Sequence, residues 1–166
     1  MKLELIDILS SSGASTGFEG DINFDGESLS GMDISFEGPV HIKGRAENIG
    51  GQVKISARVT AKIVASCARC MKAIFEDVDF EFTERLAGKE TEVQEDDDVI
   101  LLESSVVDVA DLALNNFITV SPMKYLCKED CKGLCPHCGV DRNESACGCD
   151  EANVDPRFDV LNDLFR

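Results

Sequence analysis

The sequence predicts an α+β fold that is mainly antiparallel β-sheet, followed by a C-terminal zinc-knuckle module and short helices. Three observations predict it: polar and apolar residues alternate over the first two-thirds of the chain, a helical apolar pattern follows, and eight cysteines form four close pairs. The chain has 166 residues, of which 43% are hydrophobic, which suits one compact domain with a small module. Closure of the sheet into a partial barrel is left open.

We expect two parts along the chain. Residues 1–105 form an antiparallel β domain, with a hairpin that carries Cys67 and Cys70 at its tip and an acidic loop over residues 88–98. We interpret that loop as a mobile surface segment in preference to a metal or docking site, because its acids repel one another. Residues 106–166 supply a helix, the cysteine-rich zinc-binding module and a C-terminal helix.

Period-two alternation places the strands. A short strand is expected around residues 18–24, and residues 32–37 and 40–45 alternate on either side of Gly38-Pro39, which is typical of a strand, a turn and a strand. The clearest strands are 53–65 and 73–84, joined by a turn at 67–71. Two registers keep their apolar faces together: one pairs Val59 with Val78, and the other pairs Arg58 with Glu81. Residues 75 and 76 fit neither register, which predicts a bulge there.

Two helices are predicted. Asp108 can cap a helix whose apolar residues, from Val109 to Phe117, recur at helical spacing, and Pro122 ends it. Near the C-terminus, Asp155-Pro156 is typical of a helix start, and an apolar stripe follows it.

The charge balance restricts the class of partner. Sixteen basic residues against 32 acidic ones give a net charge of −16, which argues against a protein that holds bare nucleic acid by phosphate neutralisation alone. Residues 41–72 hold seven bases and one acid, but we expect Lys54, Arg58 and Lys62 to pair mostly with acids of the neighbouring strand. The basic residues left as candidate RNA or partner contacts are Lys43, Arg45, Arg69 and Lys72.

The cysteine pairs predict metal sites. In a reducing compartment, clustered cysteines in even number indicate metal before disulfides, and four thiolates suit a tetrahedral zinc ion. Short loops favour one site of Cys135, Cys138, Cys147 and Cys149, and a second of Cys67, Cys70, Cys127 and Cys131. The main alternative joins the 67/70 pair to the 135/138 pair. We expect zinc, two ions or at least one, with iron left open and His137 a non-ligand.

Other functions find less support. A thioredoxin-like redox pair lies where a strand enters a helix, whereas Cys67 and Cys70 are expected between two strands. A thiol redox or iron–sulfur protein therefore stays the second hypothesis. With two histidines, no glycine-rich phosphate loop and no nucleophile beside a base, an enzyme is not expected. The acidic start and the lack of a long apolar run predict an intracellular protein without membrane contact.

The cysteine segment and its surroundings resemble a known family. Residues 121–149 read S-P-M-K-Y-L-C-K-E-D-C-K-G-L-C-P-H-C-G-V-D-R-N-E-S-A-C-G-C, and D-P-R-F-D-V-L-N-D-L follows at 155–164. Upstream, C-A-R-C follows a long strand and D-V-A-D-L begins the helix. Over roughly residues 30–166 this layout resembles the YceD family, the large ribosomal RNA subunit accumulation proteins.

The resemblance implies a cytoplasmic bacterial factor, or an organellar relative, that supports synthesis, processing or stability of large-subunit (23S) ribosomal RNA without catalysis. Cys67 and Cys70 match the family's hairpin pair, and the other six cysteines match its cysteine-rich form. The acidity adds a hypothesis about the partner: a basic ribosomal protein or a pre-ribosomal ribonucleoprotein of the large subunit, with direct binding of naked RNA left uncertain, and no small-molecule substrate.

Overall fold

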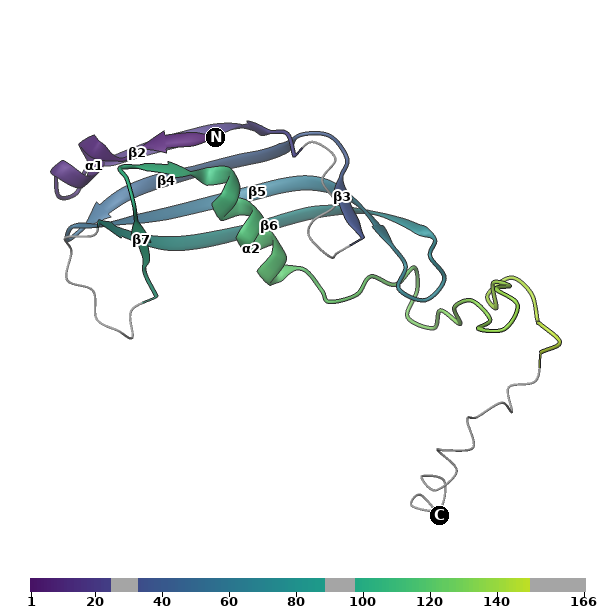
Figure 1. The fold of residues 1–166 in the computed structure, drawn as a ribbon. Helices are drawn as coiled ribbons and strands as arrows, with labels where there is room; N and C mark the ends of the chain where they lie inside the picture. The colour runs from purple at the N-terminus through teal and green to yellow at the C-terminus, as the bar shows by residue number, and fades with distance from the viewer. Residues whose placement is uncertain (25–32, 89–97, 150–166) are drawn as a thin grey trace, which may run out of the picture.

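The computed structural model describes residues 1–24, 33–88 and 98–149 and has one main β-sheet with a helix packed on it (Figure 1). The main sheet has the strand order β2-β4-β5-β6-β7, and β3 also pairs with β5. The elements in chain order are β1 (Lys2–Glu4), α1 (Ile6–Ser10), β2 (Ser15–Ile22), β3 (Ile34–Phe36), β4 (Val40–Ile49), β5 (Gln52–Ser66), β6 (Ala73–Gly88), β7 (Ile100–Leu102), β8 (Val106–Asp108) and α2 (Val109–Val120). All pairings are antiparallel except that of β6 with β7.

The long β5–β6 hairpin confirms one of the two predicted registers. Arg58 lies opposite Glu81 and Val59 opposite Phe80, and the pairing runs without interruption from Gln52–Ala87 to Ser66–Ala73. The predicted bulge at residues 75 and 76 is therefore wrong. Towards the tip of the hairpin no residue of β6 is fully buried: Phe75 and Glu76 are exposed and Ile74 is only half-buried, while the backbone pairing continues.

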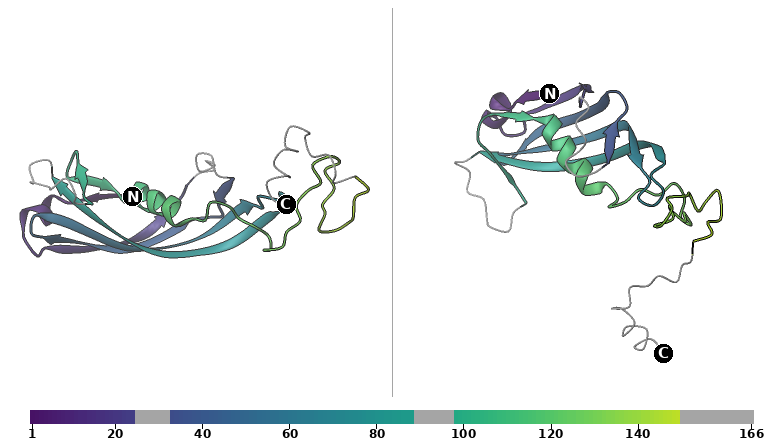
Figure 2. Two further views of the ribbon diagram at one scale, coloured as in Figure 1. Left: turned by 90° about the horizontal axis from the view of Figure 1, so that it is seen from below. Right: turned by 45° about the vertical axis from the view of Figure 1, so that its right-hand side comes forward.

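The core lies between the concave face of the sheet and α2. Asp108 caps α2 as predicted, accepting a hydrogen bond from the amide of Ala110 at 3.0 Å, and the helix ends at Val120, before Pro122. Its buried residues, which include Leu112 and Phe117, pack against the inward-facing side chains of β4, β5 and β6. Figure 2 shows the sheet edge-on as a curved layer with α2 on its concave side.

The main-sheet strands were predicted in part, and the structure adds elements at both edges. The strand over residues 40–45 extends to Ile49, and β2, β3, β5 and β6 lie where alternation predicts strands. The short elements β1, α1, β7 and β8 were not predicted; β1 and β8 form a separate two-stranded sheet. The main sheet is open, so the partial barrel does not form.

The predicted C-terminal helix and residues 89–97 of the acidic loop lie outside the described residues. The division of the chain at residue 105 stays a prediction. No helix in the described part of the chain has the length and apolar character needed to cross a bilayer.

Candidate metal centres

The tip of the β5–β6 hairpin forms the first cysteine turn. The amide of Cys67 donates to the carbonyl of Lys72 at 2.8 Å, and the amide of Met71 donates to the carbonyl of Cys67 at 2.9 Å. These two bonds close a tight turn that brings Cys67 and Cys70 together. Because β5 and β6 are both long and fully paired, the sheet carries this turn beyond the end of α2 (Figure 1).

The segment after α2 brings two more thiols to this turn. The four sulfur atoms of Cys67, Cys70, Cys127 and Cys131 lie within 4.8 Å of one another, and we call this group centre 1. Cys67 Sγ is 3.8 Å from Cys131 Sγ, and Cys70 Sγ is 3.6 Å from Cys127 Sγ. A tetrahedron with Zn–S bonds of about 2.3 Å has S···S edges of about 3.8 Å, whereas a disulfide needs about 2.05 Å. The four thiols therefore fit a tetrahedral metal ion and are not paired as disulfides.

The electrostatics of centre 1 also favour a cation. Hydrogen bonds from backbone amides, first that of Cys127, lower the pKa of Cys67 to about 6. Burial opposes ionisation of Cys131, but the amide of Gly133 and the side chain of Asn143 outweigh it and hold its pKa below the usual range. Burial and the neighbouring thiols raise the pKa of Cys127 to about 12. All four thiolates can form together only when a bound dication offsets their repulsion.

Centre 2 repeats the arrangement with the remaining cysteines, Cys135, Cys138, Cys147 and Cys149, whose sulfur atoms also lie within 4.8 Å of one another. Amides of Cys138 and His137 lower the pKa of Cys135 to about 6, while the thiols of Cys138 and Cys135 raise the pKa of Cys149 to about 12. The His137 side chain is exposed and does not belong to the group.

The grouping of the cysteines agrees with the combination that loop lengths favoured. The main alternative, which joins the 67/70 pair to the 135/138 pair, is not what the structure brings together. Metal binding by the eight thiols is the proposal developed below, because the geometry shows two four-cysteine groups that could hold ions but does not identify the ion.

Two of the candidate contact residues join the segments around the two centres. Arg69 Nη1 donates to the carbonyl of Cys131 at 2.7 Å, and its own carbonyl accepts from the amide of Leu134 at 3.0 Å. Lys72 Nζ lies 2.6 Å from Glu144 and 3.0 Å from Asp141, and these carboxylates raise the pKa of Lys72. Both side chains thus connect the hairpin tip to the cysteine-rich segment.

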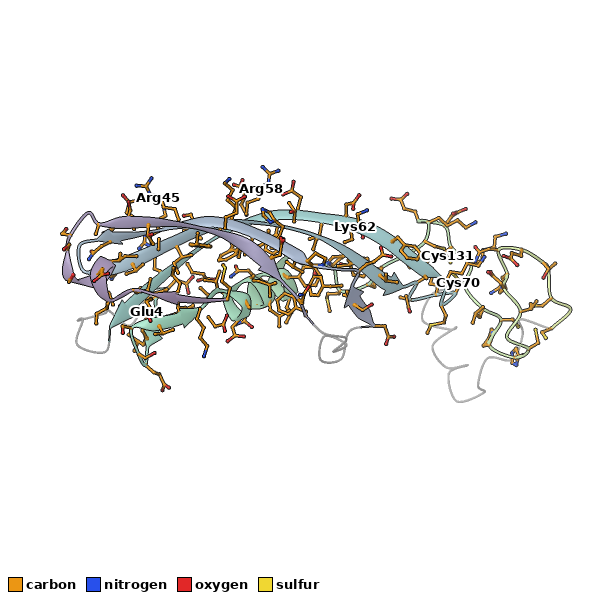
Figure 3. The ribbon with its side chains drawn as sticks, turned by 90° about the horizontal axis from the view of Figure 1, so that it is seen from above. Glu4, Arg45, Arg58, Lys62, Cys70 and Cys131 are labelled. Carbon is orange, nitrogen blue, oxygen red and sulfur yellow. The ribbon has the colours of Figure 1, made fainter. Side chains whose placement is uncertain are left out.

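The other two candidate contact residues lie on the convex face of the sheet, away from α2. Lys43 pairs with Glu19 at 2.8 Å, and Arg45 donates to the hydroxyl of Ser15. Figure 3 shows Arg45 and Arg58 on the same face. Arg58 makes two hydrogen bonds to the carboxylate of Asp79, the diagonal neighbour of Glu81, which lies opposite Arg58 in the observed register. A role for Lys43, Arg45, Arg69 and Lys72 in contacting RNA or a partner stays a prediction.

Sequence reasoning missed two residues that shape centre 1. Asn143 Nδ2 lies 3.4 Å from Cys131 Sγ, and Asn143 Oδ1 accepts from the amide of Lys132 at 2.9 Å. Gly133 has a φ of +72°, and a Cβ atom there would lie 2.9 Å from the carbonyl oxygen of Arg69. The available signal was the D-R-N sequence at 141–143, because Asx residues commonly hydrogen-bond to backbone in turns.

Comparison with known proteins points to one family. The family model described as "Large ribosomal RNA subunit accumulation protein YceD" matches residues 55–165, a stretch that contains all eight cysteines. No solved structure matches the chain.

The similar curated proteins are all uncharacterized. Protein Rv2926c of Mycobacterium tuberculosis is 32% identical over 131 residues, which cover 73% of this chain and 59% of that protein. Protein ML1660 of Mycobacterium leprae is 27% identical over 80% of this chain and 62% of its own length. Protein YlbN of Bacillus subtilis is 27% identical over 81% of this chain and 78% of its own length. The chain thus spans about three-fifths of the mycobacterial relatives.

Proposed function

The chain belongs to the YceD family of large ribosomal RNA subunit accumulation proteins, and we propose that it is a non-enzymatic zinc protein of ribosome biogenesis. It acts in the cytoplasm, where it supports the synthesis, processing or stability of 23S ribosomal RNA. Its family is named for accumulation of the large ribosomal RNA subunit and not for a catalysed reaction. The single observation that carries the proposal is the family match over two-thirds of the chain, with the hairpin tip and both centres inside it.

Zinc is the ion that the two centres favour. The S···S separations of 3.6 and 3.8 Å in centre 1 support a single tetrahedral ion with four thiolates. Bound there, zinc would neutralise thiolates and cross-link segments separated by about 60 residues; it would supply no reactive position, because four protein ligands leave none open. Iron in the same site would colour the protein, whereas zinc thiolates are colourless, so metal analysis with a visible spectrum separates the two.

The partner follows from the charge. Two zinc centres with four thiolates each carry a formal charge of −2 each, so a net charge of −16 becomes −20. A chain with this charge attracts cationic proteins and repels free RNA. The protein therefore binds a basic ribosomal protein of the large subunit, or an assembly intermediate that contains one, in preference to naked RNA.

The test has two arms. Depletion of the protein in its own organism is expected to lower the ratio of 23S to 16S ribosomal RNA, and the wild-type gene and a His137→Ala control should both restore it. In vitro, the zinc-loaded chain should bind purified basic large-subunit proteins more tightly than 23S RNA at physiological salt. An unchanged RNA ratio, or tighter binding to the RNA alone, would contradict the proposal.

A further inference from the structure

The two Cys-x-x-Cys turns share a backbone geometry but differ at the residue after the second cysteine. In each turn the amide of that residue donates to the carbonyl of the first cysteine at 2.9 Å, and its φ is positive: +61° at Met71 and +74° at Gly139. Glycine adopts this conformation freely, whereas a residue with a Cβ atom is strained in it. In the described ranges Met71 is the only residue other than glycine with a positive φ. The Met71 side chain is therefore a candidate for a role that glycine could not fill.

The Met71 side chain is displayed at the surface beside a second methionine. Met71 is 60% exposed and Met123 is fully exposed, although burial of either would be favourable. Together with Ile34, Pro122 and Tyr125 they line an open cavity of about 170 Å³. A cavity of about 150 Å³ accommodates a benzene-sized group, so this one has room for a single aliphatic or aromatic side chain.

Centre 1 holds the walls of this cavity in place. Cys67, a member of centre 1, lines one wall of the cavity. The next residue, Ala68, donates its amide to the carbonyl of Tyr125 at 2.9 Å. The amide of Ser66 donates to the carbonyl of Asp33 at 3.2 Å, which fixes the opposite wall. A metal at centre 1 would join the 67–71 turn to the segment that contains Met123 and Tyr125, so the cavity depends on the metal.

We propose that Met71 and Met123 form a docking pocket for one apolar side chain of a positively charged protein segment. Methionine is flexible and polarisable, and exposed methionines are common at surfaces that adapt to a partner. The pocket lining carries one acid, Asp33, and one base, Lys124, so the choice of a cationic segment comes from the net charge of −16 of the whole chain. This inference rests on the proposed function, which makes a basic ribosomal protein the partner.

The test uses the zinc-loaded full chain and an array of overlapping peptides that covers the proteins of the large ribosomal subunit. Binding of the tightest peptide is then measured by fluorescence anisotropy. We expect that peptide to be cationic and to lose binding when one apolar residue becomes alanine. Met123→Ser and Met71→Gly should each weaken it about tenfold or more, as the loss of a buried methionine contact implies. Ile49→Ser, which removes a similarly exposed apolar side chain at the far end of the hairpin, should leave affinity unchanged.

The Met71→Gly variant separates a docking role from a structural one. Because glycine relieves the strain, its thermal unfolding midpoint and its zinc content should equal or exceed those of the wild type while peptide binding falls. Equal affinity of wild type and both methionine variants would overturn the inference, and so would a loss of binding that follows a loss of stability. Absence of binding to every peptide would also overturn it, while leaving the binding of intact ribosomal proteins and the 23S RNA ratio as separate tests of the proposed function.

Discussion

Gly133→Ala is expected to weaken centre 1 strongly, because glycine is needed there for two separate reasons. Its φ of +72° costs a residue with a Cβ atom about 1–2 kcal/mol. The new Cβ atom would also lie 2.9 Å from the backbone oxygen of Arg69, which accepts a hydrogen bond from Leu134 worth about 1 kcal/mol. The segment must therefore move off the hairpin tip, at a total cost of about 2–4 kcal/mol. Since this segment carries Cys127 and Cys131, the affinity of centre 1 for zinc should fall by about 30- to 1,000-fold.

Gly139→Ala provides the matched control. Gly139 has nearly the same φ, +74°, but a Cβ atom there meets nothing within 4 Å. Only the conformational cost of about 1–2 kcal/mol applies, and it affects centre 2. Zinc affinity is measured by competition with a chromophoric chelator, and Co²⁺ substitution reports which centre has lost its tetrahedral thiolate spectrum. Equal losses in the two variants, or a loss at centre 2 alone in Gly133→Ala, would refute the role assigned to the contact with Arg69.

Three further predictions address the hydrogen bond from Asn143 to Cys131, the packing of the sheet and removal of the metal. Asn143→Ala removes the N–H···S hydrogen bond to Cys131 and should lower zinc affinity at centre 1 about 10- to 100-fold, measured by the same competition. Gly44→Ala makes a Cβ atom clash with the Phe18 ring and places it 2.7 Å from Ala57 Cβ, so urea unfolding should show a loss of about 1–3 kcal/mol with zinc content unchanged. Chelation of the metal should leave the amides in the middle of β5 and β6 protected from hydrogen exchange while residues 126–147 lose protection; loss of protection throughout the sheet would contradict separate stabilisation of the two regions.

Local patterns predicted the parts of the fold that alternate cleanly. Residues 53–65 alternate at every position except Val64, and their basic residues face acids of the next strand. The strand was therefore predictable and its register was narrowed to two, one of which the structure has. The bulge was wrong because Phe75, which is 67% exposed, lies on the outer face opposite Val64. Near the tip the strand no longer packs against the apolar core, so apolar residues can lie on either face. The pattern of apolar residues there therefore does not indicate how the backbones pair.

The elements that were missed depend on contacts distant in sequence. β1 is three residues long and pairs with β8, more than 100 residues away, where no local pattern could reveal it. The cysteine groups were predictable because tight spacing restricts which thiols can share one ion. By contrast, the sequence could not show which side chains join the two centres, because that depends on which turns meet in space. Three such side chains are Arg69, Lys72 and Asn143.

The hairpin tip extends beyond the apolar core, which favours a role for metal in its stability. The main core lies under α2, whereas the cluster at the tip consists of the three buried cysteines Cys67, Cys70 and Cys131, with Ile74 and Leu126 packed against them. So small a cluster cannot offset the entropy of ordering residues 121–149, but structural zinc contributes on the order of 10–16 kcal/mol. The sheet is therefore stabilised by apolar burial, and a metal at centre 1 would stabilise the tip by thiolate coordination. A metal bound at centre 1 would offset the conformational cost of the positive φ at Met71, and the proposed docking pocket lies at this same end of the hairpin.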